Sequence, residues 1–233
     1  MIESAATKAD ALVVPAHAVA VELSSQISVR VPMTAVGWGV GGKLTAPVDA
    51  LERRRRLGLP GKYMTFVGTV EPRKGLDVLI GALAKANVPI PVVLVGPKGW
   101  GGIDLQRLIG DAGLPTEQVL PLGVLDDADL SAVVAGALAL VAPSRSEGFG
   151  LPVLEAMSMG VPVVISEVPA LVELSAGAGL SVPVDNHEAL AEALVRVATD
   201  TDLRERLAVA GLARASDYSW ASAADKVWQI VTA

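Results

Sequence analysis

Two glutamates with seven residues between them, Glu147 and Glu155, frame the segment E-G-F-G-L-P-V-L-E. The apolar residues 137–142 that precede it are typical of a buried strand. Gly148 and Gly150 can let the backbone turn sharply and approach a ligand closely, because glycine tolerates conformations that other residues avoid. The pattern predicts a strand followed by a glycine loop that carries two carboxylates.

A helix is expected to follow this loop. Pro152 suits the first turn of a helix, where its missing N–H needs no partner, and Gly160 is a typical stop. The N-terminus of a helix favours an anion such as phosphate, whereas carboxylates accept hydrogen bonds from hydroxyl groups. A nucleotide sugar offers both groups. Spacing alone also fits an ordinary glycine turn with two solvated glutamates.

Two adjacent cations, Arg73 and Lys74, lie in E-P-R-K-G, between a predicted strand at residues 63–67 and a helical pattern that begins at Leu76. Arg can hold two oxygens at once and Lys acts as a point charge, so the pair suits a diphosphate. A salt-bridged surface loop is the alternative.

Composition narrows the possible classes of protein. The chain has 233 residues, of which 52% are hydrophobic and 19% charged, so a sizeable core is expected. It has no cysteine, which excludes disulfides and thiolate metal sites, and its two histidines are too few for a histidine metal cluster. Its net charge of −6 argues against nucleic-acid binding. No apolar run approaches the ~20 residues of a membrane span, and the first residues do not resemble a signal peptide. We expect a cytoplasmic protein with at most peripheral contact with the inner face of the membrane.

From residue 63 onward, strand and helix patterns alternate. This alternation predicts an α/β fold, a Rossmann-like doubly wound parallel sheet, and the continuous apolar strands indicate helices on both faces. Ligands of such sheets bind beyond the carboxyl ends of the strands, where the glycine loops should converge. We expect strands at residues 63–67, 92–95, 119–122, 137–142, 161–165 and 180–184, and helices near 76–83, 105–109, 126–134, 152–160, 170–174, 187–197, 202–213 and 220–231.

The first 45 residues read as a remnant of another domain and a linker, with strands near residues 11–14 and 31–36 and a helix near 19–23. Residues 46–216 are expected to form the ligand-binding domain. A C-terminal helix within 217–233 is expected to follow and to pack toward the N-terminal domain. Four consecutive arginines at residues 53–56 would point all round a helix, which favours a solvated linker helix. Attraction to an anionic membrane surface is the alternative.

The motif E-G-F-G-L-P-V-L-E, with the following A-M-x-x-G-x-P-V-V, resembles the E-x7-E signature of retaining GT-B glycosyltransferases of family four, the glycosyl transferases group 1. The segment V-G-T-V-E-P-R-K-G-L-D-V-L-I resembles the diphosphate loop of the same family. The resemblance covers residues 60–233 and implies the C-terminal, donor-binding half of such an enzyme, with most of the N-terminal acceptor domain missing.

The resemblance implies a role for each matching residue. Arg73 and Lys74 would neutralise the leaving nucleoside diphosphate, so that no metal or other cofactor is required. Glu147 would face the transferred sugar, and Glu155 would hold the ribose hydroxyls. The remaining donor contacts would come from the loop residues Gly68 and Thr69, from Gly123, Val124 and Leu125 beside the base, and from the amides of Phe149, Gly150 and Leu151.

The implied reaction is transfer of a hexose, with mannose favoured, from a nucleotide sugar to a hydroxyl of an acceptor sugar or lipid-linked glycan. GDP-mannose is the favoured donor, and UDP- or ADP-sugars remain open. The alternatives are a module that binds a nucleotide sugar without transferring it, or a subunit that docks onto a separate acceptor domain. Glu173 matches a family position that is more often structural or interdomain, His187 is expected to cap or face solvent, and Ser144 and Arg145 receive no role.

Overall fold

A six-stranded parallel sheet forms the centre of the computed structural model, which describes residues 2–41, 45–86 and 90–232. The strand order is β5-β4-β3-β6-β7-β8. This arrangement confirms the predicted α/β fold with a doubly wound parallel sheet. The bounds are β3 (Met64–Val67), β4 (Val92–Val95), β5 (Val119–Gly123), β6 (Leu140–Ala142), β7 (Val163–Ser166) and β8 (Leu180–Val182).

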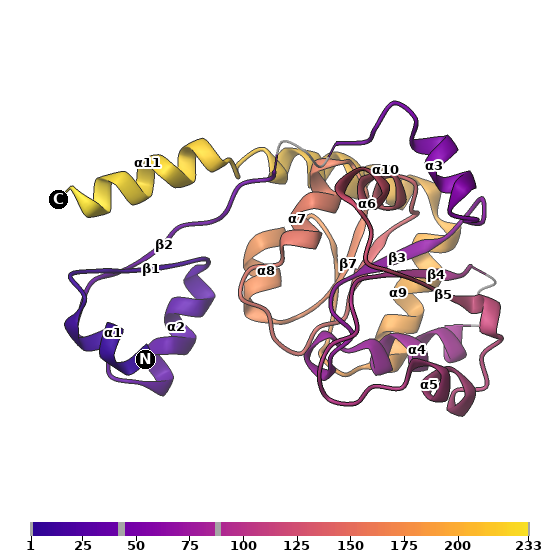
Figure 1. Cartoon of the computed structure of the whole chain (residues 1–233), viewed down its shortest axis with the longest axis horizontal. Helices are drawn as coiled ribbons and strands as arrows, with labels where there is room; N and C mark the ends of the chain where they lie inside the picture. Colours follow the sequence, from indigo (N-terminus) through magenta and orange to yellow (C-terminus); the bar gives the residue numbers. More distant parts are fainter. Residues whose placement is uncertain (1, 42–44, 87–89, 233) are drawn as a thin grey trace.

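Helices cover both faces of the sheet (Figure 1). On one face lie α4 (Leu76–Ala86), α5 (Leu105–Asp111) and α9 (His187–Thr199); on the other lie α6 (Asp127–Ala135), α7 (Leu151–Ser158), α8 (Pro169–Ser175) and α10 (Thr201–Ala215). Successive residues of one strand serve opposite cores: Val141 packs towards α4 and α9, whereas Leu140 packs towards α7. Both faces are buried, which explains why the strands are continuous apolar runs.

The strand order reverses between β3 and β6. From β3 the chain proceeds to β4 and β5, then returns to the other side of β3 and continues through β6, β7 and β8. The loops after β3 and β6 therefore leave the same edge side by side. At Gly75, where φ is +65°, a Cβ atom would lie 2.0 Å from the carbonyl oxygen of Pro143. Only glycine allows the two loops to approach so closely.

The glycine loops do converge at one edge of the sheet, as expected. The Gly68 amide donates to the Val95 carbonyl over 2.9 Å, and the Gly96 amide donates to the Gly123 carbonyl over 2.8 Å. An isolated bridge joins Val70 to Lys98. The loops after β3, β4 and β5 are thus connected through their backbones.

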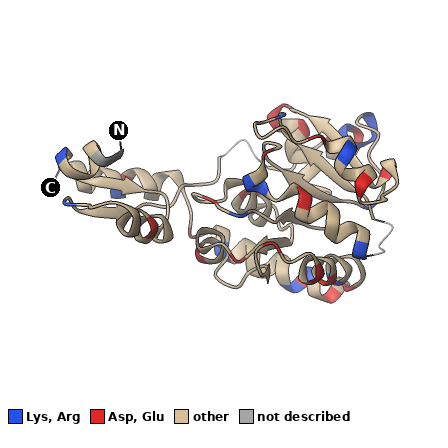
Figure 2. Ribbon diagram, turned by 90° about the horizontal axis from the view of Figure 1, so that it is seen from below, with Lys and Arg blue, Asp and Glu red and all other residues tan. Residues whose placement is uncertain are grey.

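The first part of the chain lies beside the large sheet and contains a separate, two-stranded parallel sheet of β1 (Leu12–Val14) and β2 (Met33–Ala35) (Figure 1). It also contains the helices α1 (Ile2–Lys8) and α2 (His17–Gln26), and α2 contacts α8. The last helix, α11 (Trp220–Val231), reaches back to this end, so both termini lie at the same end of the molecule (Figures 1 and 2). Residues 42–44 of the expected linker lie outside the described residues.

The arginine-rich helix α3 (Ala50–Arg56) differs from the expected solvated linker helix, because it is fastened to α6. Arg53 and Arg56 each lie 2.7 Å from the carboxylate of Asp129, and Arg54 donates to the carbonyl of Ala132. The side chain of Asp129 is only 12% exposed, and a carboxylate so placed needs a cationic partner. In the part of the chain that the structure describes, no helix has the length and apolar character needed to cross a bilayer.

Candidate functional site

The loop after β6 turns into α7 at Gly150, the N-cap, where φ is +104°. A Cβ atom there would lie 2.5 Å from the side chain of Leu171 on α8. Gly148 does not adopt a left-handed conformation, and a Cβ added there would meet nothing within 4 Å. The sharp turn that the sequence suggested for two glycines therefore depends on Gly150.

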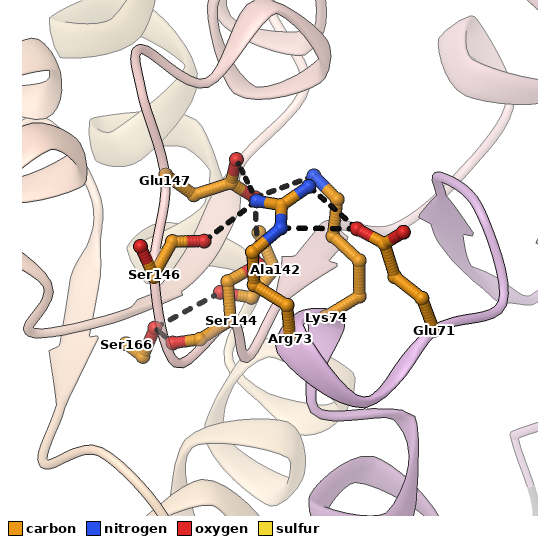
Figure 3. Close-up of polar contacts among 8 residues, drawn as sticks. All are labelled: Glu71, Arg73, Lys74, Ala142, Ser144, Ser146, Glu147 and Ser166. Carbon is orange, nitrogen blue, oxygen red and sulfur yellow. Dashed lines mark hydrogen bonds and ion pairs between the residues drawn. The ribbon is translucent and has the colours of Figure 1, made fainter. Parts of the chain in front are cut away.

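Glu147 lies at the centre of a polar cluster between the loops after β3 and β6 (Figure 3). Its Oε1 atom accepts from Lys74 Nζ over 2.6 Å and from Ser144 Oγ over 2.7 Å, and its Oε2 atom accepts from Arg73 Nη1 over 3.1 Å. The side chains of Glu147 and Lys74 are only 10% and 13% exposed. Charged groups this deeply buried require pairing, and here each has it.

Arg73 extends the cluster to a second carboxylate. Its Nε and Nη2 atoms donate to Glu71 Oε1 over 3.0 and 2.6 Å, and its Nη1 atom also donates to the carbonyl of Ser146 over 2.7 Å. Partial burial acts to lower the pKa of Arg73, but Glu147 and Glu71 outweigh burial and raise that pKa. The guanidinium therefore stays charged at any physiological pH.

Sequence reasoning missed three members of this cluster. Glu71 and Ser144 were quoted within their motifs without a role, and Ser166 on β7 was not considered. The Ser166 hydroxyl donates to the carbonyl of Ser144. This bond fixes, from the neighbouring strand, the start of the loop at residues 143–150, which we call the glutamate loop. The signal available for Glu71 was its position two residues before Arg73, and for Ser144 its position three residues before Glu147. No comparable signal was available for Ser166.

The family resemblance implied separate contacts for these groups, with Arg73 and Lys74 on the diphosphate and Glu147 facing the transferred sugar. The structure instead joins Arg73 and Lys74 directly to Glu147, with Glu71 completing two positive and two negative charges. A diphosphate that enters would compete with Glu147 for the two cations.

Two cavities open beside the cluster. One, of about 950 Å³, is lined by Gly68, Lys98, Gly123 and Val124 among others, so it unites residues predicted to contact the diphosphate and the base. The other, of about 600 Å³, lies between α2 and the glutamate loop, with Glu147 in its wall. Two other residues that were expected to contact the donor are Thr69, which lies beside Gly99, and Leu125, which packs with the core under α6.

The side chain of Phe149 is part of the core. It is 4% exposed and packs between Trp38 and Tyr218, with ring centroids 5.5 and 5.7 Å away. Only its backbone can serve a ligand, as for Gly150 and for Leu151, the first residue of α7. The aromatic contacts hold the glutamate loop against the segment that leaves β2.

Glu155 lies on α7, half-buried and close to Asp127 at the start of α6. Burial, with a smaller contribution from the negative charge of Asp127, raises the pKa of Glu155 to about 7. Neither cavity is lined by its side chain. A carboxyl group with such a pKa is nearly balanced between its two protonation states at neutral pH.

Glu173 links the large sheet to the N-terminal elements. Its carboxylate accepts from the backbone amides of His17 and Ala18, over 2.8 and 2.7 Å, at the N-terminus of α2. This contact agrees with the interdomain position implied by the family motif. His187 begins α9, with its ring against Gly81, where a Cβ would lie 2.1 Å from Nδ1.

Comparison with known proteins identifies the family. The family model described as glycosyl transferases group 1 matches residues 49–214, which include every loop of the candidate site. The chain belongs to the glycosyl transferases group 1 family. Its fold is accordingly that of the GT-B glycosyltransferases.

Several curated glycosyltransferases are similar to this chain. O-antigen chain mannosyltransferase B of Escherichia coli is 37% identical over 162 residues, 68% of this chain and 42% of that protein. Phosphatidyl-myo-inositol mannosyltransferase of Mycobacterium tuberculosis is 36% identical over 194 residues, 78% of this chain and 51% of that protein. The chain spans about half the length of the curated relatives it matches.

Solved glycosyltransferase structures extend the likeness to almost all of the chain. Sucrose-phosphate synthase from Thermosynechococcus elongatus superposes with a TM-score of 0.83 at 26% identity, covering 99% of this chain and 60% of that one. The Anabaena protein HepE, solved in complex with UDP and glucose, superposes with a TM-score of 0.88 at 23% identity, covering 98% of this chain and 64% of that one.

The raised pKa of Glu155 predicts a pH-dependent stability. Between pH 4.5, the ordinary pKa, and about 7 the folded state keeps a proton that the unfolded chain has released, so stability is lost as pH rises through this window. Glu155→Gln removes this loss, and its Tm relative to the unmodified chain should be higher at pH 8 than at pH 5. Thermal unfolding followed by circular dichroism measures both.

The exposed Glu192 on α9 provides a control, since Glu192→Gln should show the same relative Tm at the two pH values. An equal offset for Glu155→Gln at pH 5 and pH 8 would show that its carboxyl group is not perturbed.

Proposed function

We propose that this chain is the donor-binding part of a retaining glycosyltransferase. It would bind a nucleotide sugar and place the hexose for transfer to an acceptor hydroxyl. The observation that supports this best is the cluster of Arg73, Lys74 and Glu147 at the point where the strand order reverses. Ligands of doubly wound sheets bind there, and the two cavities adjoin it.

The chemistry follows from these groups. The bond between the anomeric carbon and the β-phosphate oxygen breaks, and the nucleoside diphosphate leaves with the electron pair. The acceptor oxygen bonds to the anomeric carbon on the same face and passes its proton to the departing diphosphate. Arg73 and Lys74 would stabilise the charge that develops on the diphosphate, the largest contribution expected from the protein. Because two fixed cations supply this stabilisation, we propose that no metal ion is needed.

For the donor we propose GDP-mannose first, with UDP- and ADP-sugars as the other candidates. Two curated relatives are mannosyltransferases by name. HepE, which shares the fold, was solved with UDP and glucose. We propose Glu155 as the partner of the ribose hydroxyls, with the base near Gly123 and Val124, which line the larger cavity. We further propose that the protein acts in the cytoplasm on a sugar or lipid-linked glycan.

A nucleotide-sugar-binding module is a second candidate function, because the chain spans only about half of its curated relatives. Calorimetry with GDP, UDP and ADP, followed by incubation with the matching sugar donors, separates the two functions. Binding together with sugar transfer or donor hydrolysis supports the enzyme, whereas binding alone supports the module. A folded sample that binds none of the three nucleotides would contradict both.

Lys74→Ala should weaken diphosphate binding and leave nucleoside binding unchanged. A charge-assisted hydrogen bond contributes about 1.5–3 kcal/mol, so the Kd for the nucleoside diphosphate should rise about tenfold or more. Calorimetry with GDP and guanosine, or with whichever base binds, measures the two affinities.

Lys85 is a matched control, because it forms a Lys–Glu pair of the same length, 2.6 Å to Glu188, at an exposed site. Lys85→Ala should change neither affinity. Equal losses for diphosphate and nucleoside in Lys74→Ala would show that Lys74 does not bind the diphosphate.

Glu147→Gln should have the opposite effect on the same ligand. The substitution removes the negative charge that competes for Arg73 and Lys74, so the nucleoside diphosphate should bind about threefold to tenfold more tightly. Sugar transfer, measured with this chain together with an acceptor domain, should fall because the side chain that faces the sugar would no longer be a carboxylate. Glu188→Gln is the matched control; weaker diphosphate binding by Glu147→Gln would disprove the competition.

We also propose that the N-terminal elements α1 to β2, together with α11, form a docking surface for an acceptor domain, carried on the same or a separate polypeptide. Trp220, Val227, Trp228 and Val231 form an apolar stripe along α11, and both tryptophans are at least half exposed. The likeness to sucrose-phosphate synthase supports this occupant, because the chain covers only 60% of that longer structure.

This docking can be tested by coexpression with the part of E. coli O-antigen chain mannosyltransferase B that the chain does not match. We expect the two polypeptides to purify together, and Trp220→Ser with Trp228→Ser to reduce the yield of complex. Trp100→Ser changes an equally exposed tryptophan on the loop after β4 and should leave the yield unchanged. Equal yields of complex from the unmodified chain, from the variant with both α11 substitutions and from Trp100→Ser would contradict the proposed surface.

A further inference from the structure

We propose that Arg145 is a positioning residue that holds the backbone of Arg73 and Lys74 in the geometry needed for the diphosphate. The inference rests on the proposed function, since it assigns a purpose to the loop that carries those two cations. Arg145 lies in the motif P-S-R-S-E-G, and neither spacing nor the family resemblance gave it a role.

Arg145 contacts the loop at residues 68–75, which carries Arg73 and Lys74, through both its backbone and its side chain. Its amide donates to the carbonyl of Arg73 over 2.7 Å, and its Nη1 atom donates to the carbonyl of Pro72, also over 2.7 Å. Because these two successive carbonyls belong to the peptide units on either side of the Arg73 Cα atom, the two hydrogen bonds fix both peptide planes. The side chains of Arg73 and Lys74 therefore start from a backbone that the glutamate loop holds in place.

Two carboxylates hold the guanidinium of Arg145 in turn. Nη1 and Nη2 donate to the two oxygens of Asp77, in the first turn of α4, over 2.9 and 2.6 Å. Nε donates over 2.7 Å to Asp185, which follows β8 and has φ at +59°. One side chain thus joins the loops that follow β3, β6 and β8, three strands of which only β3 and β6 are neighbours.

The side chain of Arg145 is held as firmly as that of Arg73. Four of its N–H groups are engaged by Pro72, Asp77 and Asp185, which leaves one guanidinium N–H for any other partner. Four N–H groups of Arg73 are likewise engaged, by Glu71, Glu147 and the Ser146 carbonyl. The difference lies in the partners: Arg145 bonds to the backbone of the loop that carries the two cations, whereas Arg73 and Lys74 bond to the side chain of Glu147. This geometry fits support of the neighbouring cations.

The test compares substitutions that separate geometry from charge. Arg145→Met should raise the Kd for the nucleoside diphosphate about tenfold and leave the Kd for the nucleoside unchanged, because misplaced binding groups lose their contacts. Arg145→Lys keeps the charge but cannot reproduce the fork, so it should resemble Arg145→Met. Wild-type affinity in Arg145→Lys would overturn the proposal, because charge alone would then suffice.

Asp77→Asn gives an independent answer if the Arg145 variants do not fold. It removes a negative charge near an anion site, so electrostatics alone would tighten diphosphate binding. If Asp77 acts by holding Arg145, binding should instead weaken. Tighter or unchanged binding in Asp77→Asn would contradict the positioning role.

A double-mutant cycle shows whether Arg145 acts through Lys74. The effects of Arg145→Met and Lys74→Ala on diphosphate affinity should be less than additive, because the first substitution already displaces Lys74. Full additivity would mean that Arg145 contributes separately, and would overturn the proposal. Arg53→Met is the control: Arg53 has a similarly half-buried guanidinium with two carboxylate partners, and its loss should not change the affinity.

Hydrogen exchange of the ligand-free protein distinguishes failure of this inference from failure of the proposed function. Amides of residues 73–75 should exchange faster in Arg145→Met than in the unmodified chain, and should not change in Arg53→Met. If the unmodified chain binds no nucleotide, the proposed function fails. The exchange result still tests whether Arg145 holds the loop that carries Arg73 and Lys74. Unchanged exchange at residues 73–75 would overturn the inference, whatever the nucleotide affinities.

Discussion

The pairing of one buried carboxylate, Glu147, with Lys74 and Arg73 is the constraint on which the rest of the site depends. Neither loop can move away without leaving a charge unpaired in a poorly solvated place, which is among the costliest changes a protein can suffer. The strand order brings the two loops together, and Gly75 removes the side chain that would keep them apart. The Ser166 hydroxyl then fixes the start of the glutamate loop from the neighbouring strand, and the Ser144 hydroxyl donates to Glu147 within the loop.

Much of the fold could be predicted from local pattern alone. The helix at Trp220–Val231 has the predicted bounds, because its apolar spacing and its Ser219 cap are both local signals. Strand ends were less predictable: residues 137–142 contain a strand only over Leu140–Ala142, because strand ends are set by pairing with neighbours far along the chain. The arginine run at residues 53–56 was misinterpreted for a similar reason. Nothing local to α3 indicates that Asp129 lies opposite.

The candidate site shows the same division. Its residue types and the edge of the sheet at which they lie could be inferred from motifs and from the rule for parallel sheets. The direct contact between Lys74 and Glu147 could not, because it depends on β3 and β6 being neighbours although two strands separate them in sequence. The half-buried state of Glu155 and the packing of Phe149 between Trp38 and Tyr218 likewise arise from segments remote in the chain.

The internal neutrality of the cluster has a consequence for how fast a nucleotide could arrive. Long-range electrostatic steering requires an uncompensated field, and here two cations are cancelled by Glu71 and Glu147 within a chain whose net charge is −6. An anionic donor would therefore approach without attraction from a distance, and added salt, by screening the overall repulsion, would not slow its encounter with the site. Capture of the donor would depend on contacts made after arrival, when the lysine and arginine exchange an internal partner for the incoming phosphates.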